Sequence, residues 1–285
     1  MTTVLTAPNG EVKFGIGLPT ALINDQLRIM DQSPAIFEQL LAGNLDALLD
    51  LARWGQQVGT DLVDILIMHS DLNEVELLPR IAARVIAEIG CPVSLDSRNP
   101  QALQAALEAI RPWKALINSV SAEKDCLEII LPIVKKYGAV VVGMPIGDIY
   151  GLPKKAAERV SEAKIILQAC QGIGIPPEDI VLDAICLASS AEPDSFQETM
   201  QTLRVFHQEL GVSTTLGIGN AGYGMPDPTV IDLAYLISAI PCGLDSALVN
   251  PATRGLVETV RAVDFLSASD PVGRRYIQNF RKRKS

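Results

Sequence analysis

The chain has 285 residues, enough for one α/β barrel of about 250 residues or for two average domains. Its 33 acidic and 24 basic residues give a net charge of −9, which disfavours nucleic acid and anionic membrane as partners. Five cysteines without a CxxC pair, and only two histidines, disfavour a disulfide framework or a zinc site. No secretion signal and no apolar run of about 18 residues is found, so we expect a cytoplasmic protein.

Short apolar runs alternate with longer amphipathic stretches along the whole chain. The runs occupy residues 12–18, 61–68, 91–96, 115–120, 139–144, 180–187, 214–219 and 246–250. Continuous apolar runs of this length are typical of parallel strands that are buried on both faces. Eight strand–helix units in order predict a closed (β/α)8 TIM barrel, and we expect residues 1–285 to form a single domain. An open doubly wound sheet would usually need five or six strands.

Local signals predict where several connections begin and end. Asn99-Pro100 places a side-chain acceptor and then a proline at the start of a helix. Ser195 and Glu198 are spaced as a capping box that opens a helix over 195–210. The segment 19–43, between the first predicted strand and its helix, is the longest connection. We expect it to lie over the mouth of the barrel.

The last twelve residues carry a basic cluster in an otherwise acidic chain. A solvated tail is the simpler interpretation, and a docking patch is the alternative. The six cations are Arg274, Arg275, Arg281, Lys282, Arg283 and Lys284.

Polar residues follow four of the predicted strands at the points where those strands end. Asp96, Asn118 and Asp183 each come directly after apolar residues, and Asn220 follows the seventh run. In a TIM barrel the carboxyl ends of the strands meet at one face, where catalytic and binding residues collect. The alternative is that each residue caps a helix or closes a turn. Four such residues on one rim favour a shared site.

The residue types limit the chemistry of this site. The chain has no Ser/His/Asp set, no lysine inside a strand end and no cluster of metal ligands, so nucleophilic and metal-assisted catalysis lack their usual groups. A carboxylate accepts paired N–H donors, and an amide both donates and accepts. Two carboxylates and two amides therefore suit a flat heterocycle with donors and acceptors along its edges.

A glycine motif in the seventh unit offers a rival interpretation. Residues 217–222 match GxGxxG after a strand, the pattern of a dinucleotide-binding dehydrogenase. Residues 224–228 intervene before the next helix, so the third glycine cannot pack that helix against the strand. The glycines are better explained by a close approach of backbone to ligand, with Asn220 projecting into the mouth.

These segments together resemble a known family, the pterin-binding methyltransferases that act between methyltetrahydrofolate and a corrinoid protein. That family shares its barrel with dihydropteroate synthase and with the folate domain of cobalamin-dependent methionine synthase. The resemblance covers residues 60–265. It rests on the segments 95–100 (LDSRNP), 116–123 (LINSVSAE), 151–154 (GLPK), 182–183 (LD) and 216–220 (LGIGN).

The resemblance implies a function and a role for each matching residue. Asp96, Asn118 and Asp183 would bind the pyrimidine edge of the pterin, and Asn220 would act as the catalytic residue near N5. The substrate would be tetrahydrofolate or methyltetrahydrofolate, with cobalamin or another corrinoid carried by a partner protein. A homodimer is also implied. The alternative is a pterin-binding barrel whose catalytic activity is different or lost.

Three segments depart from the family pattern. The family usually has Gly-Glu-Arg after its first strand, where this chain shows Gly17-Leu18-Pro19. It usually has Asp-x-Asn in the second strand, where Leu66 replaces the amide, and often Ser before the Asn of the seventh loop, where Gly219 stands. We expect these changes to affect the far edge of the pterin site, the methyl acceptor or the direction of transfer. Dihydropteroate synthase fits less well, because its closing Arg-x-His element has no counterpart in residues 246–265.

Overall fold

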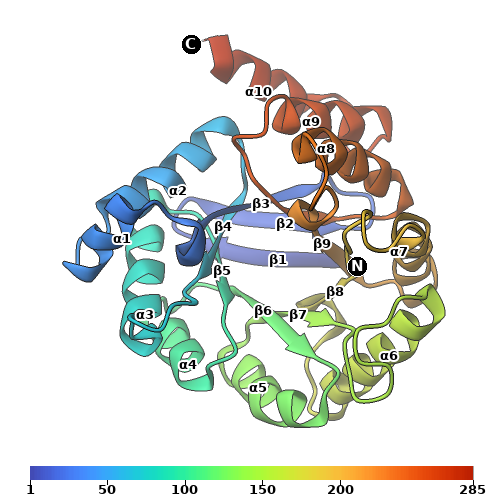
Figure 1. The fold of residues 1–285 in the computed structure, drawn as a ribbon, viewed down its shortest axis with the longest axis horizontal. Coiled ribbons are helices and arrows are strands. Elements are labelled where there is room, and N and C mark those ends of the chain that lie inside the picture. The colour runs from blue at the N-terminus through green and yellow to red at the C-terminus, as the bar shows by residue number, and fades with distance from the viewer. Residues whose placement is uncertain (285) are drawn as a thin grey trace.

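The computed structural model describes residues 1–284, with only the main chain of Lys284. Eight parallel strands close into a barrel in the order β10-β3-β4-β5-β6-β7-β8-β9. Helices surround the strands as a ring (Figure 1). The predicted (β/α)8 TIM barrel is therefore confirmed.

The elements have the following bounds. The strands are β1 (Thr2–Ala7), β2 (Gly10–Gly15), β3 (Ala21–Arg28), β4 (Leu62–Leu66), β5 (Val93–Asp96), β6 (Leu116–Ser121), β7 (Val140–Met144), β8 (Ile180–Asp183), β9 (Ser213–Gly217) and β10 (Ser246–Val249). The helices are α1 (Pro34–Leu41), α2 (Asp46–Val58), α3 (Glu74–Arg84), α4 (Pro100–Ala109), α5 (Lys124–Tyr137), α6 (Ala156–Gly172), α7 (Ser195–Val205), α8 (Pro228–Ala239), α9 (Leu256–Leu266) and α10 (Arg274–Lys284). A 3-10 turn, η5 (Ile218–Asn220), follows β9.

The first predicted strand is wrong. Residues 12–18 overlap β2, which pairs antiparallel with β1 in an N-terminal hairpin outside the barrel sheet. The first barrel strand is β3, inside the segment 19–43 that was expected to be a loop over the mouth. Its sequence ALINDQLR has polar residues in its second half, so it lacks the continuous apolar run that marks the other barrel strands. The remaining seven predicted runs overlap β4 to β10.

The hairpin closes the amino-terminal end of the barrel. Leu5 of β1 and Phe14 of β2 are fully buried, and they cluster with inward residues of the barrel strands such as Ile23 and Leu116. The hydroxyl of Thr3 donates to Ser213 Oγ at 2.9 Å. Gly17-Leu18-Pro19 therefore lies between the hairpin and β3, at the end opposite the strand ends that carry Asp96 and Asn118. The family comparison at these three residues was made at the wrong segment.

Helix starts were predicted with mixed success. Asn99 caps α4 as expected, because its Oδ1 accepts from the backbone N–H groups of Gln101 and Ala102. The capping box at Ser195 is wrong, since the Ser195 hydroxyl donates to Leu187 O instead. The Glu198 carboxylate accepts from the N–H of Ala156 at 2.8 Å and so joins α7 to the start of α6.

The basic carboxyl-terminal segment forms a helix, and its cations Arg274, Arg281, Lys282 and Arg283 are exposed to solvent. Helix α10 lies along the outside of the barrel next to α9 and extends away from it (Figure 1), with contacts to α2 as well. The side chain of Lys284 and residue Ser285 lie outside the described residues. Across residues 1–284, none of the helices has the length and apolar character needed to cross a membrane.

Candidate active site

A cavity of about 920 Å³ opens at the carboxyl ends of the barrel strands. All four residues predicted from the sequence line it: Asp96, Asn118, Asp183 and Asn220. They come from β5, β6, β8 and the turn after β9. The barrel therefore brings together side chains that lie up to 124 positions apart in the sequence.

Asp96 ends β5, and Asn118, the third residue of the neighbouring strand β6, lies opposite it in the register of the two strands. The Nδ2 of Asn118 donates to Oδ1 of Asp64 at 3.3 Å, and the Ser94 hydroxyl donates to the same oxygen at 2.5 Å. Because Asp64 takes an amide N–H, the carbonyl oxygen of Asn118 is directed to accept from a ligand. Asp64 is fully buried, and its Oδ2 has no hydrogen-bond partner among residues 1–284.

The carboxyl groups of this cluster hold protons more tightly than an ordinary aspartate. Burial, followed by the nearby charge of Asp64, raises the pKa of Asp96 to about 8. Burial also raises the pKa of Asp64 to about 6, against the hydrogen bonds from Ser94 and Asn118. At neutral pH Asp96 is therefore available both as a neutral donor and as a charged acceptor.

Asp183 lies at the end of β8 and is 7% exposed. Its Oδ1 accepts from the N–H of Ile185 at 2.7 Å, which fixes the orientation of the carboxylate. Burial raises the pKa of Asp183 to about 6, while the Ile185 N–H and the charge of Arg159 act in the other direction. The buried Arg159 donates to the carbonyls of Ala184 and Ile185 at 2.8 and 3.0 Å, so the backbone that carries Asp183 is firmly held.

Asn220 differs from the other three because it is exposed at the mouth of the cavity. It ends the turn η5, and helix α8 begins only at Pro228. The N–H of Gly222 is taken by Asp232 Oδ1 at 2.8 Å. No helix starts directly after the glycine motif, so its local structure is not that of a dinucleotide-binding turn.

Apolar side chains from four of the strands and their loops form much of the wall of the cavity. They suit the faces of a flat ring, while the polar groups meet its edges. These apolar residues are Leu66, Ile67, Met68, Met144, Ile146, Leu152, Ile185, Leu187 and Leu248.

Three charged residues near the site were not assigned a role from the sequence. Asp64 appeared only as a departure from a motif, although an acid within the run DLVDILIM is itself a signal of a buried functional group. Asp25 and Arg28 lie on β3, which was taken for a loop. Arg28 lines the cavity, and its charge lowers the pKa values of Asp64 and Asp96.

Residues 33–250 match a family model described as "Pterin binding enzyme". This match covers far more than half of the chain and contains all four predicted site residues. The chain belongs to the pterin-binding enzyme family.

Curated relatives in this family agree with the segments identified from the sequence. The chain is 24% identical over 233 residues to the methylcorrinoid:tetrahydrofolate methyltransferase of Eubacterium limosum, covering 80% of this chain and 84% of that protein. It is 25% identical over 226 residues to methionine synthase of Mycobacterium tuberculosis, covering 75% of this chain. The match spans only 19% of methionine synthase, so it concerns one part of that larger protein.

Solved structures of pterin-binding enzymes share the fold. Dihydropteroate synthase of Yersinia pestis, solved with a pterine-sulfa conjugate, superposes with a TM-score of 0.69 at 17% identity, covering 95% of this chain and all of that chain. Dihydropteroate synthase of Vibrio fischeri gives 0.67 at 17% identity, covering 93% of this chain and 98% of that chain. At such identities the likeness establishes the barrel alone.

Two departures from the family pattern lie at this site. Leu66 ends β4 opposite Asp96 and lines the cavity, so an apolar group stands where the family usually has an amide. Gly219 precedes Asn220 within η5 and is exposed. The first makes one wall of this cavity less polar.

Proposed function

We propose that this pterin-binding barrel is a methyltransferase that moves a methyl group between N5 of tetrahydrofolate and the cobalt of a corrinoid protein. The observation that carries the proposal is the convergence of Asp96, Asn118 and Asp183 on one apolar-walled cavity with Asn220 at its mouth. The similarity to the methylcorrinoid:tetrahydrofolate methyltransferase supports the same reaction.

The three inner residues would bind the pyrimidine edge of the pterin. Asp96 and Asp183 offer carboxyl oxygens to the ring N–H groups, and Asn118 offers the amide oxygen that its bond to Asp64 leaves directed at a ligand. Burial of these groups strengthens their hydrogen bonds, because little water competes for them. Leu66 and Met144 would contact the faces of the ring.

Asn220 would assist the chemical step. When the methyl group leaves N5, the N5–CH3 bond breaks and its electron pair stays on N5, which must then be protonated or hydrogen-bonded. An amide that binds N5 more strongly as this charge develops lowers the activation free energy of methyl transfer. Asn220 is exposed at the mouth, and in this proposal the folate and an approaching partner would meet there.

In the proposed reaction the second position of the methyl group would be the cobalt of a corrinoid bound to a separate protein. This cobalt would be a strong nucleophile in its reduced form. The mouth of the cavity exposes large apolar side chains, among them Met68, Tyr223 and Met225, which such a partner would cover. The homodimer implied by the resemblance stays a prediction.

The proposal is tested by methyl transfer from 5-methyltetrahydrofolate to reduced cobalamin, followed by the absorbance change of the cobalamin. We expect turnover by the unaltered protein and a loss of about 100-fold in kcat for Asn220→Ala, the size seen when one transition-state hydrogen bond is removed. The affinity for 5-methyltetrahydrofolate should change less than about threefold in this variant. Asn118→Ala is the matched amide variant, and it should lose affinity instead.

Equal losses of kcat and affinity in Asn220→Ala would contradict its role near N5. Binding of 5-methyltetrahydrofolate without any turnover, with free cobalamin and with corrinoid proteins, would favour the alternative of a pterin-binding barrel with lost or different catalysis. Absence of folate binding would refute both.

A further inference from the structure

The guanidinium of Arg159 is a buried charge that has no role in the methyl transfer proposed above. Arg159 lies in the first turn of α6 and is fully buried. It shares the inward face of this helix with the buried residues Ala156, Ala163 and Ile166. A charge on such a face is costly to bury unless it is paired, so the contacts of Arg159 indicate its role.

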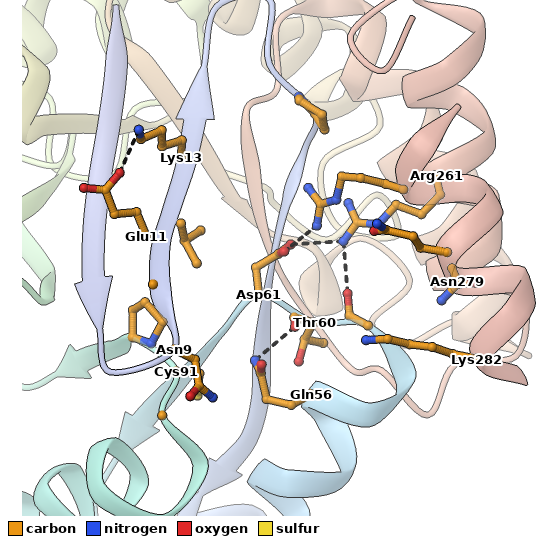
Figure 2. Close-up of a pocket in the computed structure, with 18 of the residues that line it drawn as sticks. Asn9, Glu11, Lys13, Gln56, Thr60, Asp61, Cys91, Arg261, Asn279 and Lys282 are labelled. Atoms are coloured by element: carbon orange, nitrogen blue, oxygen red, sulfur yellow. Dashed lines mark hydrogen bonds and ion pairs between the residues drawn. The ribbon is translucent and has the colours of Figure 1, made fainter. Parts of the chain in front are cut away.

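Another buried arginine, Arg261, shows how this chain compensates such a charge elsewhere. It lines a second cavity, of about 540 Å³, at the opposite end of the barrel. Arg261 pairs with Asp61 at 3.0 Å and with Asp264 at 3.4 Å. Figure 2 shows its contact with Asp61. Arg159 has no such carboxylate partner within residues 1–284, where its hydrogen bonds reach carbonyls and one hydroxyl.

Arg159 connects two loops at the mouth of the folate site. Its Nε donates to Pro153 O at 3.2 Å, in the loop after β7. Its Nη1 donates to the carbonyls of Ala184 and Ile185, in the loop after β8, at 2.8 and 3.0 Å. Leu152 and Ile185 both line the cavity, so one buried side chain holds two parts of its wall together.

Ile185 has a backbone conformation that a β-branched residue rarely adopts. Its φ is 61°, in the left-handed region. The Ile185 N–H donates to Asp183 Oδ1 at 2.7 Å. The Ile185 carbonyl accepts from Arg159 and, at 2.8 Å, from the hydroxyl of Thr199. Strain of this kind persists only where surrounding contacts impose it, and it is concentrated at functional sites. The strained residue thus links Arg159 to the carboxylate of Asp183.

The charge of Arg159 also acts on Asp183. Burial raises the pKa of Asp183 to about 6, whereas the Ile185 N–H and then the charge of Arg159 lower it. A guanidinium stays protonated in proteins, so this charge is present at every pH at which the protein is folded. Arg159 therefore favours the ionised form of Asp183.

The other ionisable groups near the guanidinium are neutral or already paired. They are Tyr235, Glu198 and Cys186. Burial raises the pKa of the Tyr235 hydroxyl and raises that of the Cys186 thiol to about 12, so both are neutral at neutral pH. Glu198 pairs with Lys155 at 3.1 Å. The charge of the guanidinium therefore remains available to the carboxylate of the cavity.

The hydrogen bonding of Arg159 is incomplete for a group that serves stability alone. Its Nη2 is buried and has no hydrogen-bond partner among residues 1–284. Apolar side chains of similar volume often stabilise a fold as well as a buried charge does. A buried guanidinium with an unpartnered nitrogen is better explained by an effect on the neighbouring site.

We propose that Arg159 is a positioning residue of the folate site, which fixes Asp183 through Ile185 and stabilises the ionised Asp183 carboxylate with a buried positive charge. Arg159 does not line the cavity, so it acts through Asp183 and not by contact with the ligand. This inference rests on the proposed function, because the ligand of Asp183 is taken to be the pterin ring of the folate.

The affinity for 5-methyltetrahydrofolate, measured by equilibrium titration at pH 6 and pH 8.5, tests the proposal. Arg159→Gln removes the charge and keeps an amide donor. Its loss of affinity should be about fivefold larger at pH 6 than at pH 8.5. The reason is that a rise of the Asp183 pKa from about 6 to about 7 lowers the ionised fraction by this factor at pH 6. The titration of Asp96 is common to both proteins and cancels in the comparison.

Two variants separate the charge from the hydrogen bonds. Thr199→Val removes the other donor to Ile185 O without a change of charge, so its loss of affinity should be the same at both pH values. Arg204→Gln removes an exposed cation from α7 and should leave the affinity unchanged. Equal losses at the two pH values in Arg159→Gln would show a merely structural role and overturn the proposal.

Carbon NMR of protein labelled at the aspartate carboxyl groups follows the ionisation of Asp183 without folate, with Asp183→Asn for assignment. The midpoint should lie about one pH unit higher in Arg159→Gln, and in the second neutral variant Arg159→Met, than in the unaltered protein. An unchanged midpoint in either variant with native circular dichroism would overturn the proposal. So would a midpoint above about pH 7 in the unaltered protein, which needs no variant. If the unaltered protein binds no folate, the proposed function fails, and the NMR midpoint still decides whether Arg159 stabilises the carboxylate.

Discussion

Asp96 lies beside a set of buried polar contacts in which Ser94 and Asn118 both donate to Asp64. Asp64 fixes the amide of Asn118, and its charge acts on Asp96. A ligand that reaches Asp96 therefore meets groups that are already oriented. Preorganised groups of this kind bind without paying the entropy of ordering them again.

Replacing Asp96 with alanine should weaken the binding of 5-methyltetrahydrofolate by about 10- to 100-fold, since leaving one partner of a buried hydrogen bond unpaired costs about 1–3 kcal/mol. Equilibrium titration measures the change. Asp71→Ala is the matched control, because Asp71 is exposed in the loop after β4 and does not line the cavity. Equal affinity of Asp96→Ala and the unaltered protein would show that Asp96 does not bind 5-methyltetrahydrofolate.

The stability of the unliganded protein should depend on pH through the same residues. Burial raises the folded-state pKa of Asp96 to about 8 and of Asp64 to about 6, above the unfolded value near 3.9. Between about pH 4 and 8 the folded protein then holds more protons than the unfolded chain, so the free energy of unfolding falls as pH rises through this range. The protonated carboxyl groups contribute their full stability only below about pH 4, where they are protonated in the unfolded chain as well.

Urea unfolding at about pH 5.5 and 8.5 checks this dependence. In Asp96→Asn one titrating group is gone, so its loss of stability between the two pH values should be smaller than that of the unaltered protein. Identical losses in the two proteins would contradict the raised pKa of Asp96.

Among the elements, β3 separates what the sequence pattern could predict from what it could not. Strands β4 to β10 lie in short runs rich in Val, Ile and Leu, because helices cover one face and the barrel interior the other, and the alternation of these runs with amphipathic stretches finds them. In β3 the residues Asn24, Asp25 and Gln26 interrupt the run, so a segment with polar groups near the site was taken for a connection. The site residues on β5, β6 and β8 were found since each follows an apolar run.

The hairpin β1–β2 makes its own contribution to stability. Phe14 is fully buried among the inward side chains of the barrel, so Phe14→Ala should lower the free energy of unfolding by about 3–5 kcal/mol. Denaturant unfolding measures this loss. Glu11→Ala on the same strand is exposed and should change stability by less than about 0.5 kcal/mol. A loss below about 1 kcal/mol for Phe14→Ala would show that the hairpin is not part of the barrel core.

For the whole molecule, barrel closure explains how distant residues reach one cavity. The carboxyl ends of all eight strands lie on one face, so a polar residue that ends a strand is placed there whatever its position in the chain. Contacts such as Asn118 to Asp64 depend on the register of neighbouring strands, which a single sequence does not disclose. The two ends of the barrel carry separate cavities, and the four predicted site residues line only the one at the carboxyl ends of the strands.

The most direct test is a crystal structure of the protein soaked with 5-methyltetrahydrofolate. We predict that the pterin lies in the cavity at the carboxyl ends of the strands, with its pyrimidine edge on Asp96, Asn118 and Asp183 and with N5 next to Asn220. A pterin bound elsewhere, or bound in this cavity with N5 turned away from Asn220, would contradict the proposed methyl transfer.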